Sequence, residues 1–340
     1  MDELLDQSIL ATVVYYDVLG APLNVLELWK YRVRIERFVD AQRRKIRAPR
    51  TRPVLSDIMR RLDKSELLRK HLTEHNGYYM LSDRHGFFEA RMHDRKIANA
   101  KWNLLRRYIA RLQAIPFVRG VFISGSVALG VSSEASDLDV LIVTAHGRIW
   151  TCRLLVTLWM QLWGVRRIGD ITKDKICLNH FITDESLHIP YKSLYNAQTY
   201  LHLIPVKDLL GGLRARFYTE NAWIFDYCGA GIDDFDPRVS DIRTIPLRRW
   251  RDWLRRFFEA PLGTKLGDTL EHWVRSYQKK RIENDPRTYE EGGRVVADDM
   301  HLEFHPRSKE KEVLEKYNEK LRQIKLNQFA HETDSGLKKV

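Results

Sequence analysis

Two aspartates and a glycine–serine pair carry the clearest chemical signal in the sequence. An apolar run at 118–124 leads directly into Gly125 and Ser126, and a second apolar run begins at Asp137 and continues through Asp139. Side chains alternate between the two faces of a strand, so the two aspartates would point the same way. Carboxylates that converge from one face suit Mg²⁺, which prefers oxygen ligands. Two such ions about 3.5–4 Å apart can hold the attacking and leaving oxygens of an in-line displacement at phosphorus.

Gly125 and Ser126 suit the binding of a nucleotide's phosphates. A glycine lets the backbone approach a bulky anion because it has no Cβ. Ser126 adds a hydroxyl, and the backbone N–H groups of a short helix after it would face the phosphates. Each half of the pattern is weak alone, because Gly-Ser pairs and Asp-x-Asp triplets occur by chance in many chains. Their order and their places on two apolar strands make the combination specific. The alternative without a function is that two acids simply begin an exposed strand after a loop.

The segment 121–143 resembles the signature of the DNA-polymerase-beta-like nucleotidyltransferase superfamily, in which an apolar residue and Gly-Gly or Gly-Ser are followed, after a spacer, by Asp-apolar-Asp or Glu. The surrounding α/β pattern extends the resemblance to residue 228. It implies an enzyme that transfers a nucleoside monophosphate from an NTP to an acceptor hydroxyl and releases pyrophosphate. By position, Asp137 and Asp139 would be the catalytic Mg²⁺ ligands, and Gly125 and Ser126 the triphosphate clamp.

The sequence departs from that family at the third carboxylate, which usually lies on a following strand. The corresponding apolar run, 176–183, contains no acid. Asn179 could take this place through its amide oxygen, and His180 could accept a proton. Neither supplies negative charge for a second metal. An alternative is therefore a site that binds nucleotide but catalyses slowly or not at all. Three acids could instead reach the site from flanking loops: Asp170, Asp174 and Asp184.

Residues 1–95 predict a winged helix-turn-helix-like domain. Apolar residues recur at helical spacing in three short runs, and Asn76-Gly77 is a hairpin turn signal followed by aromatic strand residues. Between the helices, residues 43–52 hold six basic side chains and no acid. This run is either a solvated loop or a phosphate contact.

The rest of the chain predicts a fold of the α/β (α+β) class. Residues 96–228 would form the nucleotidyltransferase core, a small mixed sheet with helices. Residues 229–326 predict a helical C-terminal region, and 327–340 a disordered tail. The expected core elements are strands at 118–124, 137–144 and 176–183, a buried helix at 149–165, and helices at 194–204 and 209–227.

One predicted C-terminal helix, 247–258, combines five arginines with four aromatic residues. Trp250, Trp253, Leu254 and Phe257 fall on one helical face. The favoured interpretation is core packing beneath a basic surface. The alternatives are a face that holds nucleic acid, with arginine on phosphates and aromatic rings on bases, and a helix that lies on a membrane surface.

Composition limits the kind of protein and the partners that the chain can have. The 340 residues allow two or three domains, and 44% hydrophobic residues argue against a disordered chain. The net charge of +12 indicates anionic partners: nucleic acid, nucleotide phosphates or an anionic membrane surface. Three scattered cysteines argue against disulfides or structural zinc. The N-terminus lacks a secretory signal and no run is long enough to span a bilayer, so we expect a cytoplasmic protein without membrane insertion.

The sequence therefore supports two hypotheses, an enzyme and a regulatory protein. The first is a magnesium-dependent nucleotidyltransferase whose partners are an NTP and, through the winged helix and the basic segments, nucleic acid. The second is a DNA-binding regulator whose transferase-like domain senses nucleotide or is catalytically weakened. A winged helix used for protein contact remains a further option, and the acceptor could be an RNA end, an antibiotic-like small molecule or a protein side chain.

Overall fold

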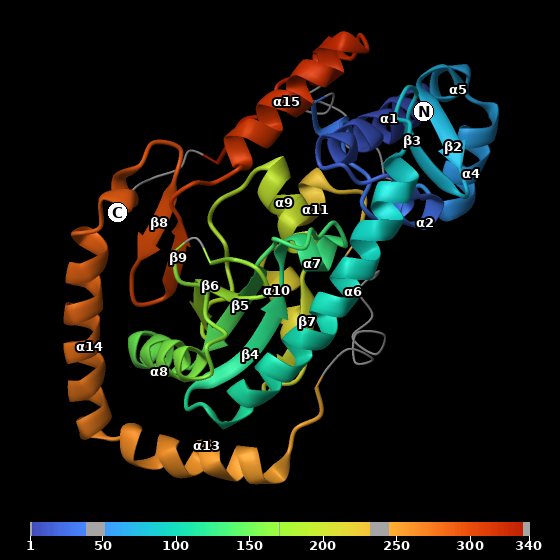
Figure 1. Cartoon of the computed structure of the whole chain (residues 1–340). Helices are drawn as coiled ribbons and strands as arrows, with labels where there is room; N and C mark the ends of the chain where they lie inside the picture. The colour runs from blue at the N-terminus through green and yellow to red at the C-terminus, as the bar shows by residue number, and fades with distance from the viewer. Residues whose placement is uncertain (1, 39–51, 170, 232–244, 336–340) are drawn as a thin grey trace.

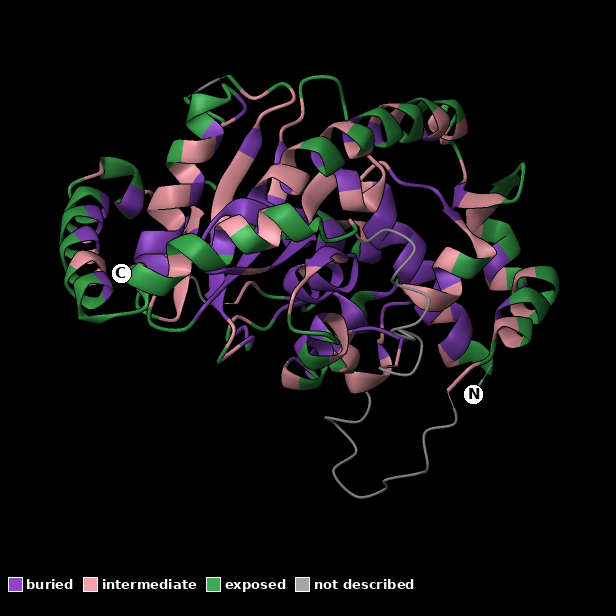
Figure 2. Ribbon diagram, turned by 90° about the horizontal axis from the view of Figure 1, so that it is seen from below, coloured by how far each residue is buried: buried purple, intermediate pink, exposed green. Residues whose placement is uncertain are grey.

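The computed structural model describes residues 2–38, 52–169, 171–231 and 245–335. The chain is mixed α/β, and within these residues it forms a three-stranded and a six-stranded sheet (Figure 1). Figure 2 shows buried segments concentrated in the interior and exposed segments on the peripheral helices. None of the helices in these ranges is long and apolar enough to cross a membrane.

Among the described residues of the N-terminal part, the helices pack against the small sheet or on one another. The predicted hairpin is confirmed: β2 pairs antiparallel with β3, and the turn residues Asn76 and Gly77 both have positive φ, at 49° and 80°. A third strand, β1, pairs with the other side of β3. The basic residues 43–51 lie outside the described residues. The elements are α1 (Asp2–Val18), β1 (Leu23–Asn24), α2 (Val25–Lys30), α4 (Leu55–Lys64), α5 (Glu66–His71), β2 (Leu72–His75) and β3 (Tyr78–Leu81).

The long helix α6 (Phe87–Arg111) leads from this part to the large sheet, whose order is β7-β4-β5-β6-β9-β8. The three strands predicted in the core are confirmed, and β5 pairs antiparallel with β4 but parallel with β6. A strand that was not predicted, β7, follows the first of the two helices predicted at 194–227. The strands are β4 (Val118–Ile123), β5 (Leu138–Thr144), β6 (Ile176–Thr183), β7 (Ile204–Asp208), β8 (Arg294–Ala297) and β9 (His301–His305).

Alternation along the strands builds a core on each face of the large sheet. Val121 and Ile142 belong to the core that includes α6 and α8, whereas Phe122 and Leu141 belong to the core that includes α9 and α10. Both faces are therefore covered, which explains why these strands are almost continuously apolar. The covering helices are α8 (Ile149–Leu162), α9 (Leu194–Leu201), α10 (Leu213–Glu220) and α11 (Ile224–Tyr227).

The C-terminal region is not wholly helical, contrary to the prediction. It contributes the hairpin β8–β9, and β9 pairs with β6 and so extends the central sheet. Its helices are α13 (Arg249–Leu262), α14 (Lys265–Glu283) and α15 (Glu310–Gln323), the last of which packs on α1. Disorder was expected from residue 327, whereas Phe329 and Ala330 are buried in the core around α1 and α15. Residues 336–340 lie outside the described residues.

The core-packing interpretation of the 247–258 helix is wrong. Trp250, Trp253 and Phe257 on α13 are 56%, 61% and 58% exposed, whereas Arg255 is 8% exposed. The helix faces inward with its charged side, where Asp252 and Glu259 each pair with Arg255 at 2.7 Å. The ion pairs with Asp252 and Glu259 compensate the charge of the buried guanidinium, whose Nε has no hydrogen-bond partner among the described residues. The charged side of the helix can therefore face inward while the aromatic side stays exposed.

Candidate active site

The predicted site residues meet at one edge of the central sheet. β4 ends at Ile123, and Gly125 begins the short helix α7 (Gly125–Leu129). β5 and β6 run parallel and start at the same edge, where Asp139 is the register partner of Cys177. The glycine–serine bend and the two aspartates, separated by more than ten residues in sequence, are therefore neighbours in space.

Gly125 and Asp139 are in direct contact. Gly125 has φ +64°, a left-handed conformation that favours glycine. A Cβ added there would overlap Oδ2 of Asp139 and lie 3.0 Å from its Cγ. The backbone N–H of Ser124 also donates to the carbonyl of Asp139 at 3.1 Å. The glycine is thus required both by its own conformation and by the carboxylate that occupies the space of its missing side chain.

Ser126 lies one residue further on, in the first turn of α7. Its hydroxyl is 3.0 Å from the hydroxyl of Ser132, so the side chain is tied to the loop that follows the helix. Arg91 of α6 closes the other end of α7 by donating to the carbonyls of Leu129 and Gly130, both at 3.0 Å. A cation at the carbonyl end of a helix is favourable, and here it fixes the bend against α6.

Asp137 and Asp139 converge with Cys177 closely enough to hold a cation. One ligand atom from each of these three residues lies within 4.8 Å of the others. The carboxylate of Asp137 contacts Nη1 of Arg167, and Oδ1 of Asp139 accepts a long hydrogen bond, 3.4 Å, from Asn179. Two carboxylates and a neighbouring amide form an oxygen-rich group of the kind that Mg²⁺ binds.

The electrostatics of Asp139 fit such a role. The pKa of Asp139 is raised to about 6, chiefly by burial and then by the negative charge of Asp137, against the opposing effects of Arg167 and of the hydrogen bond from Asn179. The pair of carboxylates is therefore short of positive charge even with Arg167 beside it. A bound divalent cation would relieve this repulsion.

Lys101 of α6 fixes the loop that leads into Asp137. Its ammonium group is almost completely buried and donates to the carbonyls of Glu134 and Ser136 at 3.1 and 2.8 Å, and to Asp174 Oδ1 at 2.7 Å. A buried ammonium needs such a complete set of acceptors. The loop is thereby held in one conformation, and the start of β5 with it.

None of the described flanking acids supplies the third carboxylate. Asp174 is the partner of Lys101. Asp184 lies at the opposite end of β5, where its backbone N–H bonds to Thr144 and its carboxylate accepts from the backbone N–H of His146. Asp170 lies outside the described residues. Of the two stand-ins on β6, Asn179 is the one beside Asp139.

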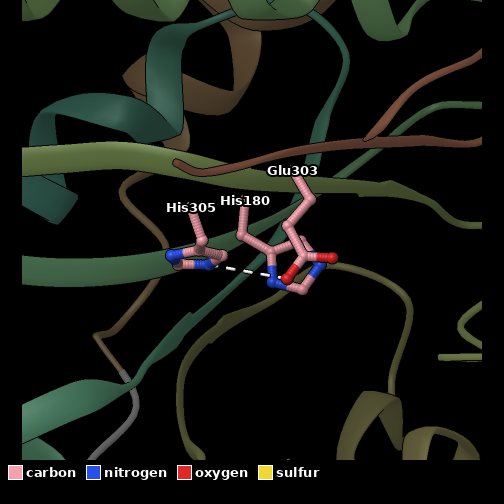
Figure 3. A group of neighbouring side chains, drawn as sticks. All are labelled: His180, Glu303 and His305. Carbon is pink, nitrogen blue, oxygen red and sulfur yellow. Dashed lines mark ion pairs between the residues drawn. The ribbon is translucent and has the colours of Figure 1, made fainter. Parts of the chain in front are cut away.

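His180 instead joins a second polar group, shown in Figure 3 with its side chains pointing toward one another. Ligand atoms of His180, Glu303 and His305 lie within 4.8 Å of one another. Burial lowers the pKa of His180 to about 4, so its imidazole is neutral at pH 7. The carboxylate of Glu303 accepts from Nε and Nη2 of Arg294 at 2.9 and 2.7 Å, so this acid is held by an arginine as well.

This second group is connected to the aspartates through Asn179. Nδ2 of Asn179 is 3.4 Å from Asp139 Oδ1 and 3.5 Å from His305 Nδ1, and Nε2 of His305 is 3.5 Å from Glu303 Oε1. Burial lowers the pKa of His305, so it can accept a proton or ligate a metal. The sequence prediction missed Glu303 and His305 because their segment was assigned to a helical region. The alternation of polar and apolar residues in 301–305, typical of a strand, could have found them.

No family model matches this chain, and no curated protein or solved structure is detectably similar to it.

Proposed function

We propose that the protein is a nucleotidyltransferase that moves a nucleoside monophosphate from an NTP to an acceptor hydroxyl. The observation that carries the proposal is the close approach of Gly125 to Asp139, which makes the bend and the carboxylate pair a single group. The resemblance of segment 121–143 to polymerase-beta-like transferases supports the same conclusion. The net charge of +12 is compatible with substrates that carry phosphates.

In this mechanism Asp137 and Asp139 would hold Mg²⁺, which would supply positive charge to neutralise the phosphates. Arg167 contacts Oδ2 of Asp137, so it would share this carboxylate with a bound cation or be displaced from it. The bend at Gly125 and Ser126 receives the triphosphate. The acceptor hydroxyl attacks the α-phosphorus in line, and the bond to pyrophosphate breaks.

The hydroxyl proton needs an acceptor that the third carboxylate supplies in related enzymes. Asn179 has no basic atom for this role, but His305 lies 3.5 Å beyond it and has a lowered pKa. His305, oriented by Glu303, is therefore the group of this edge best suited to take the proton. Such chemistry depends mainly on positioning and electrostatics, so loss of one metal ligand affects turnover more than folding.

A second function is favoured by two specific observations. β6 lacks the third carboxylate, and Arg167 already occupies Asp137. Both fit a regulatory protein that binds nucleotide weakly and uses its N-terminal part to bind DNA.

The deciding experiment incubates the pure protein with each α-labelled NTP, Mg²⁺ and candidate acceptors. We expect label on an acceptor, and a loss on the order of a hundredfold or more with Asp137→Asn or Asp139→Asn, because a metal ligand acts directly on the transition state. Asp63→Asn, a matched change at an exposed position of α4, should leave the rate unchanged. Full activity in both site variants rejects the enzyme. Tight duplex-DNA binding with a steep salt dependence and no label anywhere favours the regulator.

A further inference from the structure

A groove of about 670 Å³ opens beside the candidate site. Its walls come from α8, from α14, from the 3-10 turn η4 (Pro286–Tyr289) and from residues 166–169. Its floor includes Cys177 and Asn179, the two β6 residues that neighbour the aspartates. A molecule seated in this groove would therefore reach the sheet edge where Asp137 and Asp139 lie.

The lining of the groove is strongly basic. It contains five arginines and one carboxylate: Arg153, Arg166, Arg167, Arg281, Arg287 and Asp285. Asp285 binds Arg287 at 2.6 Å, and Arg167 contacts Asp137. This leaves three arginines that form no ion pair within the part of the chain that the structure describes, namely Arg153, Arg166 and Arg281.

These three cations repel one another. The pKa of Arg153 is lowered to about 10, chiefly by burial and then by the charges of Arg166 and Arg281. Burial and Arg281 also lower the pKa of Arg166. Like charges in a partly desolvated site destabilise the folded protein unless an anion compensates them. Asp285, the one carboxylate among the residues that line the groove, forms its ion pair with Arg287 and none with these three arginines within the described part of the chain. This deficit indicates that a ligand provides the compensating anion.

Arg153 shows the same deficit in its hydrogen bonds. Its guanidinium lies 4.5 Å from the centre of the Phe304 ring and contacts Gln278 through Nη1, so its position is fixed by two neighbours. Its Nε is buried without a hydrogen-bond partner among the described residues. A buried donor that is left unsatisfied costs free energy, and an oxyanion in the groove would satisfy it.

An aromatic ring lines the same groove, and a second ring stacks on it. Tyr277 lines it and is 55% exposed. Trp273, one turn earlier on α14, stacks on Tyr277 with 6.1 Å between ring centres and an interplanar angle of 10°. Arginines that bind phosphates, combined with exposed aromatic faces, are typical of surfaces that bind unpaired nucleotides, because every base can stack on such a face.

We propose that this groove binds the acceptor of the transfer reaction and that the acceptor carries nucleotide phosphates. Arg153, Arg166 and Arg281 bind the phosphates, Tyr277 and Trp273 stack on a base, and the acceptor hydroxyl lies at Asp137 and Asp139. The role of the bound molecule as acceptor rests on the proposed function, whereas the binding of nucleotide phosphates in the groove does not. It disfavours cationic acceptors, such as amine-rich antibiotics, because the groove would repel them.

The binding is measured by fluorescence anisotropy with a 5′-labelled single-stranded oligonucleotide, in EDTA and without NTP, so that no transfer takes place. Arg281→Gln and Arg166→Gln are expected to weaken binding about tenfold each and to reduce the salt dependence by about one ion per arginine. Arg106→Gln, at an exposed position of α6, is the matched control and should bind as the wild type does. Thermal unfolding confirms that each variant is folded.

An unlabelled mononucleotide added as competitor distinguishes the two sources of the phosphate. Competition at concentrations similar to those of the oligonucleotide supports a mononucleotide acceptor, and a requirement for several linked phosphates supports a strand end. Wild-type affinity in both groove variants overturns the proposal. Labelling of a cationic acceptor to the same extent as a nucleotide acceptor in the transfer assay overturns it as well. Loss of binding in the variants with no transfer by the wild type supports the groove and rejects the transferase.

Discussion

The guanidinium of Arg167 lies against the carboxylate of Asp137, one of the two residues proposed to hold a cation. The arginine is half-exposed and comes from a loop, so it can leave without disturbing the sheet. Its charge occupies the place where a divalent ion would act. A divalent cation bound there would therefore compete with Arg167 for Asp137.

Replacing Arg167 with glutamine should consequently tighten the binding of a divalent cation. Removing one competing positive charge from a partly exposed pair corresponds to about 1 kcal/mol, or roughly fivefold in affinity. Titration with Mn²⁺, followed by its electron paramagnetic resonance signal, measures this directly. Arg166→Gln, the adjacent arginine, serves as control because it forms no ion pair with Asp137. Weaker Mn²⁺ binding in Arg167→Gln would show that the arginine supports the metal site instead.

Gly125 should tolerate alanine worse than other glycines of the same conformation. Its φ of +64° alone costs about 1–2 kcal/mol for a residue with a Cβ, and the overlap with Asp139 adds a further penalty of roughly 1–3 kcal/mol. Gly147, with φ +68° and nothing within 4 Å of an added Cβ, provides the matched control. Urea unfolding of Gly125→Ala and Gly147→Ala gives the difference. Adding Asp139→Ala to Gly125→Ala should recover the part that is due to overlap; a purely additive double variant would contradict the contact.

Acid should destabilise the protein through its buried histidines. His202 packs against Tyr31 with 3.8 Å between ring centres and an angle of 41° between the ring planes, and its Nε2 is 3.2 Å from the hydroxyl of Tyr16. Burial lowers the pKa of His202 to about 3, and Lys30 and Arg91 act in the same direction. Because the unfolded chain binds the proton more readily, this stability is complete above pH 6.5 and is lost as the pH falls toward 3.

The slope attributable to His202 is at most about 1.4 kcal/mol per pH unit in that window. Urea unfolding at a series of pH values between 7 and 4 should give a smaller loss of stability for His202→Gln than for the wild type. His75→Gln, at an exposed position in the β2 strand, should follow the wild type. A His202→Gln curve parallel to that of the wild type would mean that the imidazole is not held neutral in the fold.

The sequence predicted the elements whose signals are local. The apolar runs of β4, β5 and β6 and the turn at Asn76-Gly77 are written in consecutive residues, and the spacing of Asp137 and Asp139 implied a shared face. What it missed depends on pairings distant in sequence. β9 becomes a strand of the sheet by pairing with β6, more than a hundred residues earlier, and this pairing brings Glu303 and His305 to the site.

Helix α13 shows a different limit. Its one-sided aromatic pattern was recognised, but the direction of that side was not. Periodicity shows that a helix has an aromatic and a charged face. Which face packs inward depends on whether the charged side chains find ion-pair and hydrogen-bond partners in the rest of the fold. Here Glu259 accepts from the backbone N–H of Phe117 at 2.6 Å and pairs with Arg119 at 2.8 Å and with Arg255 at 2.7 Å. Phe117 and Arg119 come from another segment, so of these partners only Arg255 appears in the helix's own sequence.

The orientation of α13 predicts which of its residues stabilise the fold. Trp253→Ser should change the free energy of unfolding by no more than about 0.5 kcal/mol, because the indole is 61% exposed. Glu259→Ala should cost about 1.5–3 kcal/mol, because it removes the carboxylate shared by Arg119 and Arg255 while each arginine keeps one other acid, Asp184 or Asp252. Urea unfolding of both variants tests this contrast, with Glu315→Ala, on the exposed face of α15, as the control for loss of a surface acid. A larger effect of Trp253→Ser than of Glu259→Ala would mean that the aromatic face, and not the charged one, packs inward.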